Sequence, residues 1–412
     1  MIDYTKYKLS NGLKLIVHKD NSTPLAAVNI LYNVGAKDED PNRTGFAHLF
    51  EHLMFGGSVN IPDYDGPLQL AGGENNAFTS NDITNYYCTL PAQNIDVAFW
   101  LESDRMLSLG FSEKSLEVQR NVVIEEFKQR YFNQPYGDVW LLLRPLAYKV
   151  HPYQWATIGK EIGHIEHASM EEVKSFFFSH YTPDNAIMTV AGNVEPEKIR
   201  DDAEEWFGSI KRTTMYKRQL PAEPEQTEKR TMQVERDIPF DSIYKTWHTC
   251  ARSDKEYYAV DLLTDVLSGG KSSRLYNELV KKKRLFMEVH AYLTGDIDKG
   301  LLVAEGKLVK GVKVEDAEDA LDEELSKMKA EAASENELIK VKNKVESSHA
   351  FGEADLAGRA LNLAVAELLG DTDLVNTEVS RYRSVTAGEI TDQAKKIFRD
   401  ENCSVLYYLS KN

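Results

Sequence analysis

The sequence predicts an α+β protein made of two homologous domains, each a largely antiparallel sheet covered by helices. Segments that alternate between apolar and polar residues, as strands do, are mixed with long amphipathic helical segments, without the regular β-α-β order of a parallel sheet. A stretch rich in proline and charge divides the chain near its middle. On either side of this stretch the same order of elements occurs, which is typical of a duplicated domain.

The domain boundaries follow from the dividing stretch. Residues 216–232 contain Pro221, Pro224 and many charges with little apolar periodicity, which indicates a linker. We therefore expect an N-terminal domain over residues 1–215 and a C-terminal domain over residues 233–412.

Hydrophobic periodicity places the individual elements. Period-2 alternation predicts strands, and apolar residues at helical spacing predict helices. In the first domain we expect strands near 13–17, 27–31, 76–80, 84–90 and 184–191, and helices near 45–57, 63–71, 94–108, 112–132, 136–147 and 169–180. In the second domain the first strands are expected at 233–234 and 243–247.

Length and composition limit the functional classes. With 412 residues, of which 42 % are apolar, the chain is long enough for about two to three domains. The net charge of −16 argues against nucleic acid as a partner. No run of about 18 apolar residues occurs, so we expect no membrane span. The N-terminus leads directly into a strand pattern and shows no signal peptide.

Cysteine usage bears on the compartment. Cys88, Cys250 and Cys403 are widely spaced and odd in number. This pattern predicts buried free thiols in a reducing environment, not a disulfide framework or a zinc knuckle. We therefore predict a cytoplasmic protein, with the periplasm as the alternative if a signal peptide was removed before this numbering.

The most informative segment is His48-Leu49-Phe50-Glu51-His52. Positions i and i+4 of a helix share one face, so both imidazoles can reach a single metal ion. Glu51 lies beside that face, where it can hold a water on the metal. The order of the residues matches the inverted form of the H-E-x-x-H zinc signature. The alternative is an ordinary helix with two solvated histidines.

The setting of the motif favours the metal. Apolar residues occupy nearly every side of the helix that carries the motif, which predicts a buried helix. These residues are Phe46, Leu49, Phe50, Leu53, Met54 and Phe55. Buried His and Glu side chains need partners, and a metal ion supplies one.

A catalytic zinc usually takes three protein ligands and keeps one position open. The third candidate lies in a long helix downstream, where Glu125 and Glu126 are adjacent. Glu126 stacks above Val122 and Val123 on the predicted apolar face, whereas Glu125 lies on a polar face. A buried carboxylate needs a cation more than an exposed one does. The sequence therefore favours Glu126, and Glu125 is a solvated neighbour or a support for the ligand.

An internal repeat keeps the apolar pattern of the motif but not its metal-binding residue types. Residues 47–57 superpose without gaps on residues 260–270, an offset of 213 residues that keeps the apolar positions and the glycine pair. At the chemical positions, His48, Glu51 and His52 become Asp261, Thr264 and Asp265. We therefore predict that the N-terminal domain binds zinc and that the homologous C-terminal domain lacks the metal site.

These motifs together resemble the M16 metallopeptidases, which include pitrilysin, insulin-degrading enzyme, the mitochondrial processing peptidase and small bacterial zinc proteases. Residues 45–58 look like the active-site helix of the family, and Asn76–Thr79 and Asp82–Tyr86 look like its substrate-edge strands. Residues 268–275 are similar to the Gly-rich signature of its inactive half. The resemblance covers nearly the whole chain and implies the LuxS/MPP-like form of the two-domain fold.

The resemblance also implies roles for individual residues. His48, His52 and Glu126 would bind Zn²⁺, and Glu51 would be the general base. The substrate-binding residues would be Asn76, Ala77, Phe78 and Thr79, on an edge strand that pairs with an extended peptide.

Two departures from the family pattern bear on these roles and on the assembly. Many relatives carry a glutamate two helical turns before the third ligand, where this chain has Gln119. Active relatives also grip the substrate with an Arg and a Tyr of a C-terminal domain, and the strand expected at 301–309 contains neither. We therefore expect a partner subunit to supply this pair, in a homodimer or in a heterodimer with a homologous, inactive subunit.

The sequence thus predicts a zinc-dependent endopeptidase that hydrolyses peptides or unfolded polypeptide segments inside a chamber formed with a second subunit. One alternative is a non-catalytic scaffold or assembly subunit of the same fold, and another is a zinc hydrolase of small amides. The complete set of ligands and base argues against the scaffold. The peptide-edge residues 76–79 favour peptides over small amides.

Overall fold

The computed structural model of the protein describes residues 1–211 and 218–411. These residues form two compact units. The first unit consists of Met1–Lys128, Trp155–Pro221 and Ala350–Asn376, and the second of Gln129–Gln154, Ala222–His349 and Thr377–Asn412. Residues 212–217, which contain the end of the predicted first domain and the start of the predicted linker, lie outside the described residues.

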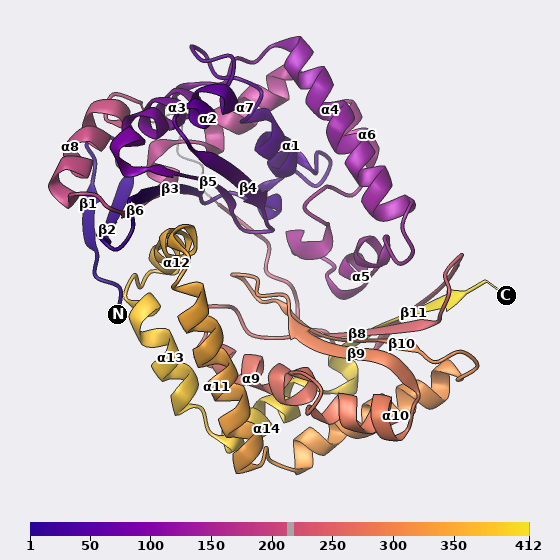
Figure 1. Ribbon diagram of the computed structural model, residues 1–412. Coiled ribbons are helices and arrows are strands. Elements are labelled where there is room, and N and C mark those ends of the chain that lie inside the picture. The colour runs from indigo at the N-terminus through magenta and orange to yellow at the C-terminus, as the bar shows by residue number, and fades with distance from the viewer. Residues whose placement is uncertain (212–217, 412) are drawn as a thin grey trace. The chain divides into compact units, whose positions relative to one another are not determined.

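The first unit is built on a six-stranded sheet with the order β1-β2-β6-β3-β5-β4 (Figure 1). Its strands are β1 (Thr5–Lys8), β2 (Lys14–Lys19), β3 (Leu25–Tyr32), β4 (Glu74–Thr79), β5 (Thr84–Pro91) and β6 (Ala186–Gly192). In this sheet β2 and β6 are parallel, and the other neighbours are antiparallel. β4 is an edge strand, and β5 is its partner among the described strands.

The second unit repeats this plan with five strands in the order β7-β11-β8-β10-β9. They are β7 (Arg230–Arg236), β8 (Ser242–His248), β9 (Phe286–Leu293), β10 (Leu301–Leu308) and β11 (Cys403–Ser410). Here β7 and β11 are parallel, and the other neighbours are antiparallel. The predicted α+β fold with two largely antiparallel sheets is confirmed.

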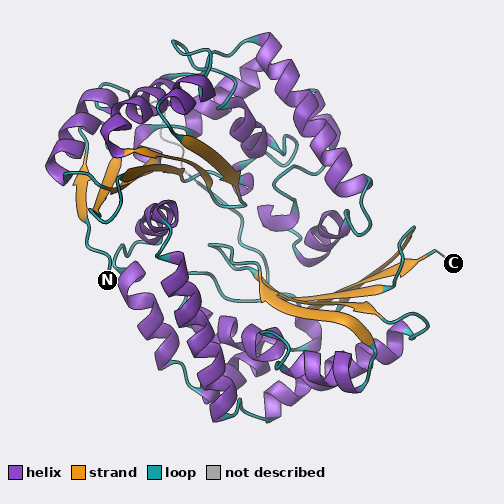
Figure 2. Ribbon diagram, in the orientation of Figure 1, coloured by secondary structure: helices purple, strands orange, loops and turns teal. Residues whose placement is uncertain are grey.

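Helices account for most of the remaining regular structure (Figure 2). The α-helices of the described residues are α1 (Phe46–Leu53), α2 (Asp65–Leu70), α3 (Ile95–Leu107), α4 (Glu113–Phe127), α5 (Val139–Ala147), α6 (Ile162–Glu166), α7 (Met170–His180), α8 (Pro196–Phe207), α9 (Tyr257–Ser268), α10 (Val314–Ala330), α11 (Glu335–Gly352), α12 (Leu356–Leu368), α13 (Leu374–Ser384) and α14 (Ala387–Ile397).

The six helices predicted for the first half are all present, with shifted ends. Helix α1 stops at Leu53, short of the predicted end, because the backbone closes into a tight turn in which Gly56 N–H donates to the Leu53 carbonyl. Gly57 follows with a φ of 95°, which only glycine adopts readily. Helix α4 ends at Phe127, and the chain continues from there as one π-helical turn, Lys128–Phe132.

The first sheet is covered on both faces. Helices α1 and α3 pack on one face, and α12 packs on the other, beneath β3 and β6 (Figure 1). In this second layer Leu356 and Ala360 of α12 meet Ala27 and Ala191 of the two strands. Seven of the eight residues of β3 are buried as a result. The prediction placed helices on one face of the sheet, and α12 adds a layer from the C-terminal half of the sequence.

The second sheet receives a helix in the same manner. Helices α9, α10 and α14 pack on one face. On the other face lies α5, which comes from the N-terminal half of the sequence and buries Val139, Leu143 and Leu146 against Tyr244, Leu406 and Tyr408. Each unit therefore contains one helix from the opposite half of the chain.

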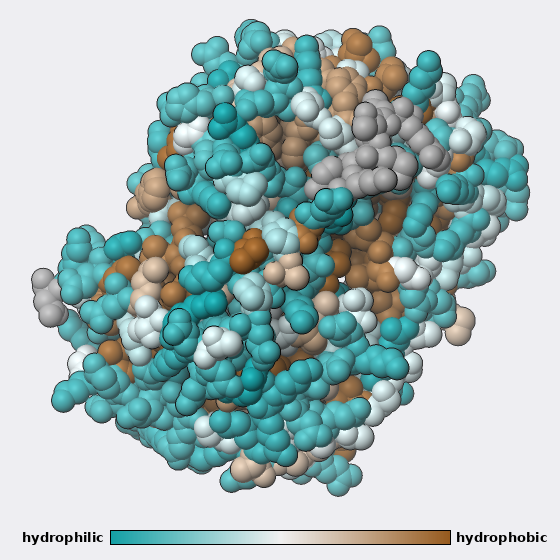
Figure 3. All heavy atoms as spheres, turned by 180° about the vertical axis from the view of Figure 1, so that it is seen from behind, coloured by the Kyte–Doolittle hydropathy of each residue, from teal (hydrophilic) through white to brown (hydrophobic). Residues whose placement is uncertain are grey.

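No helix among the described residues is long and apolar enough to cross a membrane. The face drawn in Figure 3 is mostly hydrophilic, in keeping with the net charge of −16. Cys88, Cys250 and Cys403 are free; Cys88 and Cys403 are buried as predicted, whereas Cys250 is only partly buried.

Candidate metal centre

Helix α1 carries the histidine motif, and a buried carboxylate determines where this helix begins. Glu39 accepts hydrogen bonds from the backbone N–H groups of Gly45 and Ala47, both at 2.9 Å. It also accepts the indole N–H of Trp155 at 3.1 Å. The first N–H groups of a helix have no partner within the helix, so side-chain oxygens that accept from them are favourable. Glu39 therefore anchors the start of the helix.

Gly45 permits this start for two reasons. Its φ is 90°, in the left-handed region that other residues avoid. A Cβ atom at this position would also lie 2.6 Å from the backbone oxygen of Ile158. A side chain at residue 45 would thus displace α1 from the neighbouring segment.

Aromatic packing holds the apolar side of α1. The Phe50 ring stacks on Phe176 and Tyr181, with centroid distances of 5.2 and 5.3 Å. His48 and His52 lie two positions before and after Phe50, and therefore on the opposite side of the helix. The packing of Phe50 thus turns both imidazoles away from the aromatic cluster.

Helix α4 supplies the third candidate ligand. Ser112 caps its N-terminus by accepting the backbone N–H of Ser115 at 3.0 Å. Val123 is buried, whereas Val122 is 44 % exposed, so the expectation that both valines face inward is wrong for Val122. Glu126 lies between the directions of these two valines around the helix axis. Its side chain is therefore largely sheltered, with 19 % exposed.

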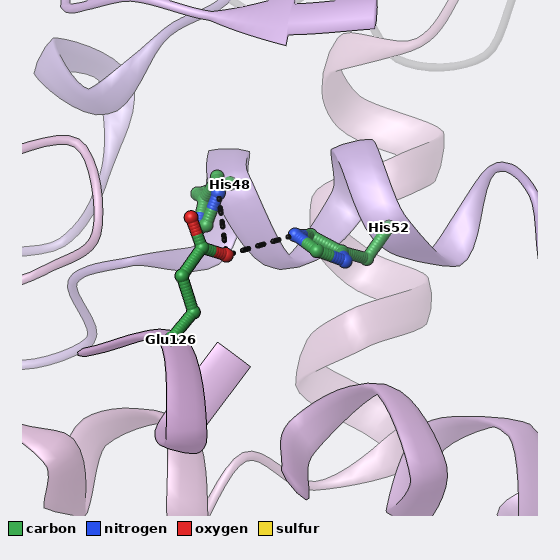
Figure 4. Close-up of side chains that lie close together, drawn as sticks. All are labelled: His48, His52 and Glu126. Carbon is green, nitrogen blue, oxygen red and sulfur yellow. Dashed lines mark ion pairs between the residues drawn. The ribbon is translucent and has the colours of Figure 1, made fainter. Parts of the chain in front are cut away.

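Figure 4 shows His48 and His52 of α1 and Glu126 of α4 pointing toward one another. Glu126 Oε2 lies 3.6 Å from His48 Nε2 and 3.4 Å from His52 Nε2. One ligand atom from each residue lies within 4.8 Å of the others. Ligands at about 2.0–2.1 Å from a tetrahedral zinc ion are roughly 3.3–3.5 Å apart. The separations from Glu126 therefore fit a zinc site.

The donor set also fits zinc. Two imidazoles and one carboxylate are typical of a catalytic zinc, which keeps one position for water or substrate. The side chain of His48 is 10 % exposed and that of His52 is 24 % exposed, so the cluster is more open on the His52 side. Glu125 points elsewhere: its side chain is 62 % exposed, and its carboxylate pairs with Lys128 at 2.7 Å. The structure brings Glu126 to the histidines and leaves Glu125 in solvent.

The predicted base and the predicted substrate strand lie beside the cluster. Glu51 belongs to α1, and its Oε2 accepts a hydrogen bond from the Thr79 hydroxyl at 2.6 Å. Thr79 ends β4, which also carries the other predicted substrate-binding residues, Asn76, Ala77 and Phe78. Glu51 is thus bonded directly to the edge strand of the first sheet.

The equivalent helix of the second unit, α9, holds no metal-binding cluster among the described residues. Asp261, which takes the place of His48, accepts the hydroxyl of Tyr382 at 2.6 Å. Asp265, which takes the place of His52, pairs with Lys344 at 2.5 Å. Carboxylates that are partly removed from water need donors or cations, and here the chain supplies both.

Two contacts of the candidate site had no clear signal in the sequence. An acidic residue directly before a helix is a capping signal, but Glu39 lies six residues before Gly45. Thr79 was predicted only as part of the substrate strand, and nothing local indicated that its hydroxyl meets Glu51.

The chain matches two protein-family models. Residues 14–141 match the insulinase model of peptidase family M16, and residues 167–345 match the peptidase M16 inactive domain. The chain belongs to peptidase family M16. A curated relative, the zinc protease PqqE of Helicobacter pylori, is 30 % identical over 413 residues, which cover 97 % of this chain and 91 % of that protein. Family membership and this name support a zinc metallopeptidase.

Solved structures show the same M16 fold. A crystal structure of a protease from Helicobacter pylori matches with a TM-score of 0.92 and 27 % identity, covering 99 % of this chain and 100 % of that one. The periplasmic protease PqqL of Escherichia coli matches in fold, with a TM-score of 0.79 at 16 % identity. That match covers 99 % of this chain and 48 % of PqqL.

Removing a ligand should remove the metal. We expect His48→Ala and Glu126→Ala each to lower the affinity for zinc by more than about 100-fold. Loss of a residue that only supports a ligand costs about 10- to 100-fold, and loss of the ligand itself should cost more. Glu125→Ala is the matched control and should keep its zinc. Inductively coupled plasma mass spectrometry of dialysed protein measures the zinc bound per chain. If Glu126→Ala kept its zinc and Glu125→Ala lost it, the third ligand would be Glu125 and not Glu126.

Glu39 should make stability depend on pH. Burial raises the pKa of Glu39 to about 8, against the opposing effect of its bonds to Ala47, Gly45 and Trp155. Between its ordinary pKa of 4.5 and about 8, the folded protein holds a proton that the unfolded chain releases. The free energy of unfolding therefore falls as the pH rises through this interval. Glu39→Gln should lack this part of the slope.

Urea unfolding of the metal-free protein at several pH values across this interval measures the slope. Glu39→Gln should also be less stable by about 1–3 kcal/mol, because its amide NH₂ faces backbone donors. Glu125→Gln, on the exposed side of α4, serves as the control and should behave like wild type. Identical slopes for wild type and Glu39→Gln would show that Glu39 binds no extra proton in the folded state.

Proposed function

We propose that this M16 chain is a zinc-dependent endopeptidase that hydrolyses peptides or unfolded polypeptide segments. The observation that carries the proposal is the convergence of His48, His52 and Glu126 beside Glu51, which is itself bonded to the edge strand β4. A metal site, a carboxylate base and a strand edge are the three parts that metal-assisted cleavage of a peptide requires.

Each residue has a distinct task in this reaction. His48, His52 and Glu126 hold the zinc ion, which when bound polarises a carbonyl oxygen and lowers the pKa of a bound water to about 7. The Glu51 carboxylate accepts a proton from the attacking water and passes it to the nitrogen of the leaving amine. The carboxylate is ionised again at the end of the cycle.

The strand β4 recognises the backbone of the substrate. Its outer edge offers N–H and C=O groups with which an extended peptide pairs as an added strand. Side chains alternate along a strand, so Ala77 faces the same side as Thr79, toward α1, while Asn76 and Phe78 face the other side. Main-chain pairing thus delivers a peptide bond next to the base. This favours a peptidase over a hydrolase of small amides.

Glu51→Gln should keep zinc and lose turnover by roughly 100- to 10,000-fold, the usual contribution of a general base. A quenched fluorescent peptide and a short amide, tested with and without a homologous subunit, measure activity. The control is Glu125→Gln, which makes the same chemical change on the exposed side of α4 and should remain active. Full activity in Glu51→Gln would exclude it as the base.

No activity in wild type with any partner would favour the scaffold role, which the inactive-domain match of residues 167–345 also allows.

We propose that a second subunit completes the chamber. The chain corresponds to about half of PqqL, since the match covers 48 % of that protein. The Arg and Tyr that the family resemblance leads us to expect are missing from β10 (Leu301–Leu308). A second copy or a homologous, inactive subunit would supply the missing grip and enclose the substrate, which limits it to peptides and unfolded segments.

Size-exclusion chromatography with light scattering tests the assembly. A homodimer should have twice the mass of the 46.7 kDa chain. A chain that needs a different partner should instead elute as a monomer and gain peptidase activity when the homologous subunit is added. A lone monomer with full activity would contradict the proposal of a completed chamber.

We propose the cytoplasm as the compartment, because the three cysteines are free and two of them are buried. The periplasm is the alternative, since PqqL of Escherichia coli is a periplasmic protease. Cell fractionation followed by immunoblotting distinguishes the two.

A further inference from the structure

The hydrogen bond between Thr79 and Glu51 joins two elements that the proposed reaction uses separately. Thr79 Oγ1 donates to Glu51 Oε2 at 2.6 Å, across 28 residues of sequence. This distance is at the short end of the usual range of about 2.5–3.0 Å for a hydroxyl that donates to an oxygen.

The donor sits on a well-anchored part of the sheet. After Thr79 the chain turns tightly, with the Ser80 N–H donating to the Ile83 carbonyl at 2.8 Å. The Ser80 carbonyl accepts the N–H of Ala36 at 3.1 Å, and the Thr84 hydroxyl donates to the Val34 carbonyl at 3.0 Å. These bonds tie the β4–β5 turn to the segment after β3. The Thr79 hydroxyl is therefore presented from a fixed position.

The acceptor is more mobile by nature. A glutamate side chain has three rotatable bonds, and holding it in one conformation costs conformational entropy. Glu51 is only partly buried, so neighbouring atoms do not enclose its side chain on all sides. A short bond from a fixed hydroxyl selects one orientation. Because a carboxylate has two oxygens, one can accept Thr79 while the other receives the proton of the water.

We infer that Thr79 is a positioning residue for the base: its hydroxyl orients the Glu51 carboxylate relative to the strand on which the peptide lies. This inference rests on the proposed function. The backbone of Thr79 then belongs to the peptide-binding edge, whereas its side chain orients Glu51. The base and the substrate are then both positioned by β4.

Two variants of Thr79 separate the hydroxyl from the shape of the side chain. Thr79→Val keeps the branched shape and removes the donor, so kcat should fall by roughly 10- to 100-fold, the range for residues that orient a group at a metal site. KM should stay near the wild-type value, because the backbone of β4 is unchanged. Thr79→Ser keeps the donor and should restore most of kcat. Thr89→Val, a threonine of the neighbouring β5 on the opposite face of the sheet, is the matched control and should behave like wild type.

Measurements other than turnover complete the test. In the Glu51→Gln background, adding Thr79→Val should leave both the zinc content and the affinity for the fluorescent peptide unchanged. A crystal structure of zinc-loaded Thr79→Val should show β4 in place and the Glu51 carboxylate turned from its wild-type orientation. A wild-type kcat in Thr79→Val, a loss of peptide affinity, or an unmoved carboxylate would each overturn the inference.

These outcomes are distinct from a failure of the proposed function. An inactive wild type, or full activity in Glu51→Gln, would remove the peptidase or its base. An active wild type, an inactive Glu51→Gln and a fully active Thr79→Val would keep the peptidase and reject only the positioning role. If wild type proves inactive, the orientation of the carboxylate in the zinc-loaded crystal still decides whether Thr79 holds Glu51.

Discussion

The start of α1 is the constraint on which the candidate site depends. Both histidines and Glu51, the proposed base, lie within five consecutive residues of this short helix, so a shift of its first turn moves all three together. The carboxylate of Glu39 holds that turn by accepting the N–H groups of Gly45 and Ala47. Stacking of Phe50 then determines which way the helix faces. A polar anchor at the end and aromatic packing along the side together orient the metal-binding face.

The remaining parts reach this face from different elements. The proposed third ligand comes from α4, whose Glu126 extends from the border between a buried and an exposed side of the helix. The hydroxyl that meets Glu51, the proposed base, comes from the end of β4. A helix, a second helix and a strand edge therefore meet at one place. Among the described strands β4 is at the edge of its sheet, which is the position that the proposed pairing with an extended peptide requires.

The second unit has the equivalent helix without the candidate metal-binding residues. Helix α9 keeps the apolar pattern of α1, but its polar positions carry Asp261 and Asp265. Tyr382 and Lys344 satisfy these carboxylates with a hydrogen bond and an ion pair. The polar positions of this helix thus have partners within the chain in the second unit, whereas in the first unit they form the candidate metal centre. The match of this region to the inactive M16 domain agrees with that difference.

The sequence by itself determined the fold class, the α1 helix and the residue types that meet at the candidate metal centre. The spacing of His48 and His52 and the helical phase of Glu126 depend on neighbours within a few turns, which local periodicity records. Local phase was insufficient at Val122, because exposure there depends on which elements pack against α4. Only the tertiary structure placed α12 on the first sheet and α5 on the second, and only it brought Glu39 to the start of α1 and Thr79 to Glu51. Such contacts join segments far apart in the chain, and a hydrogen bond between single side chains leaves no periodic trace in the residues around it.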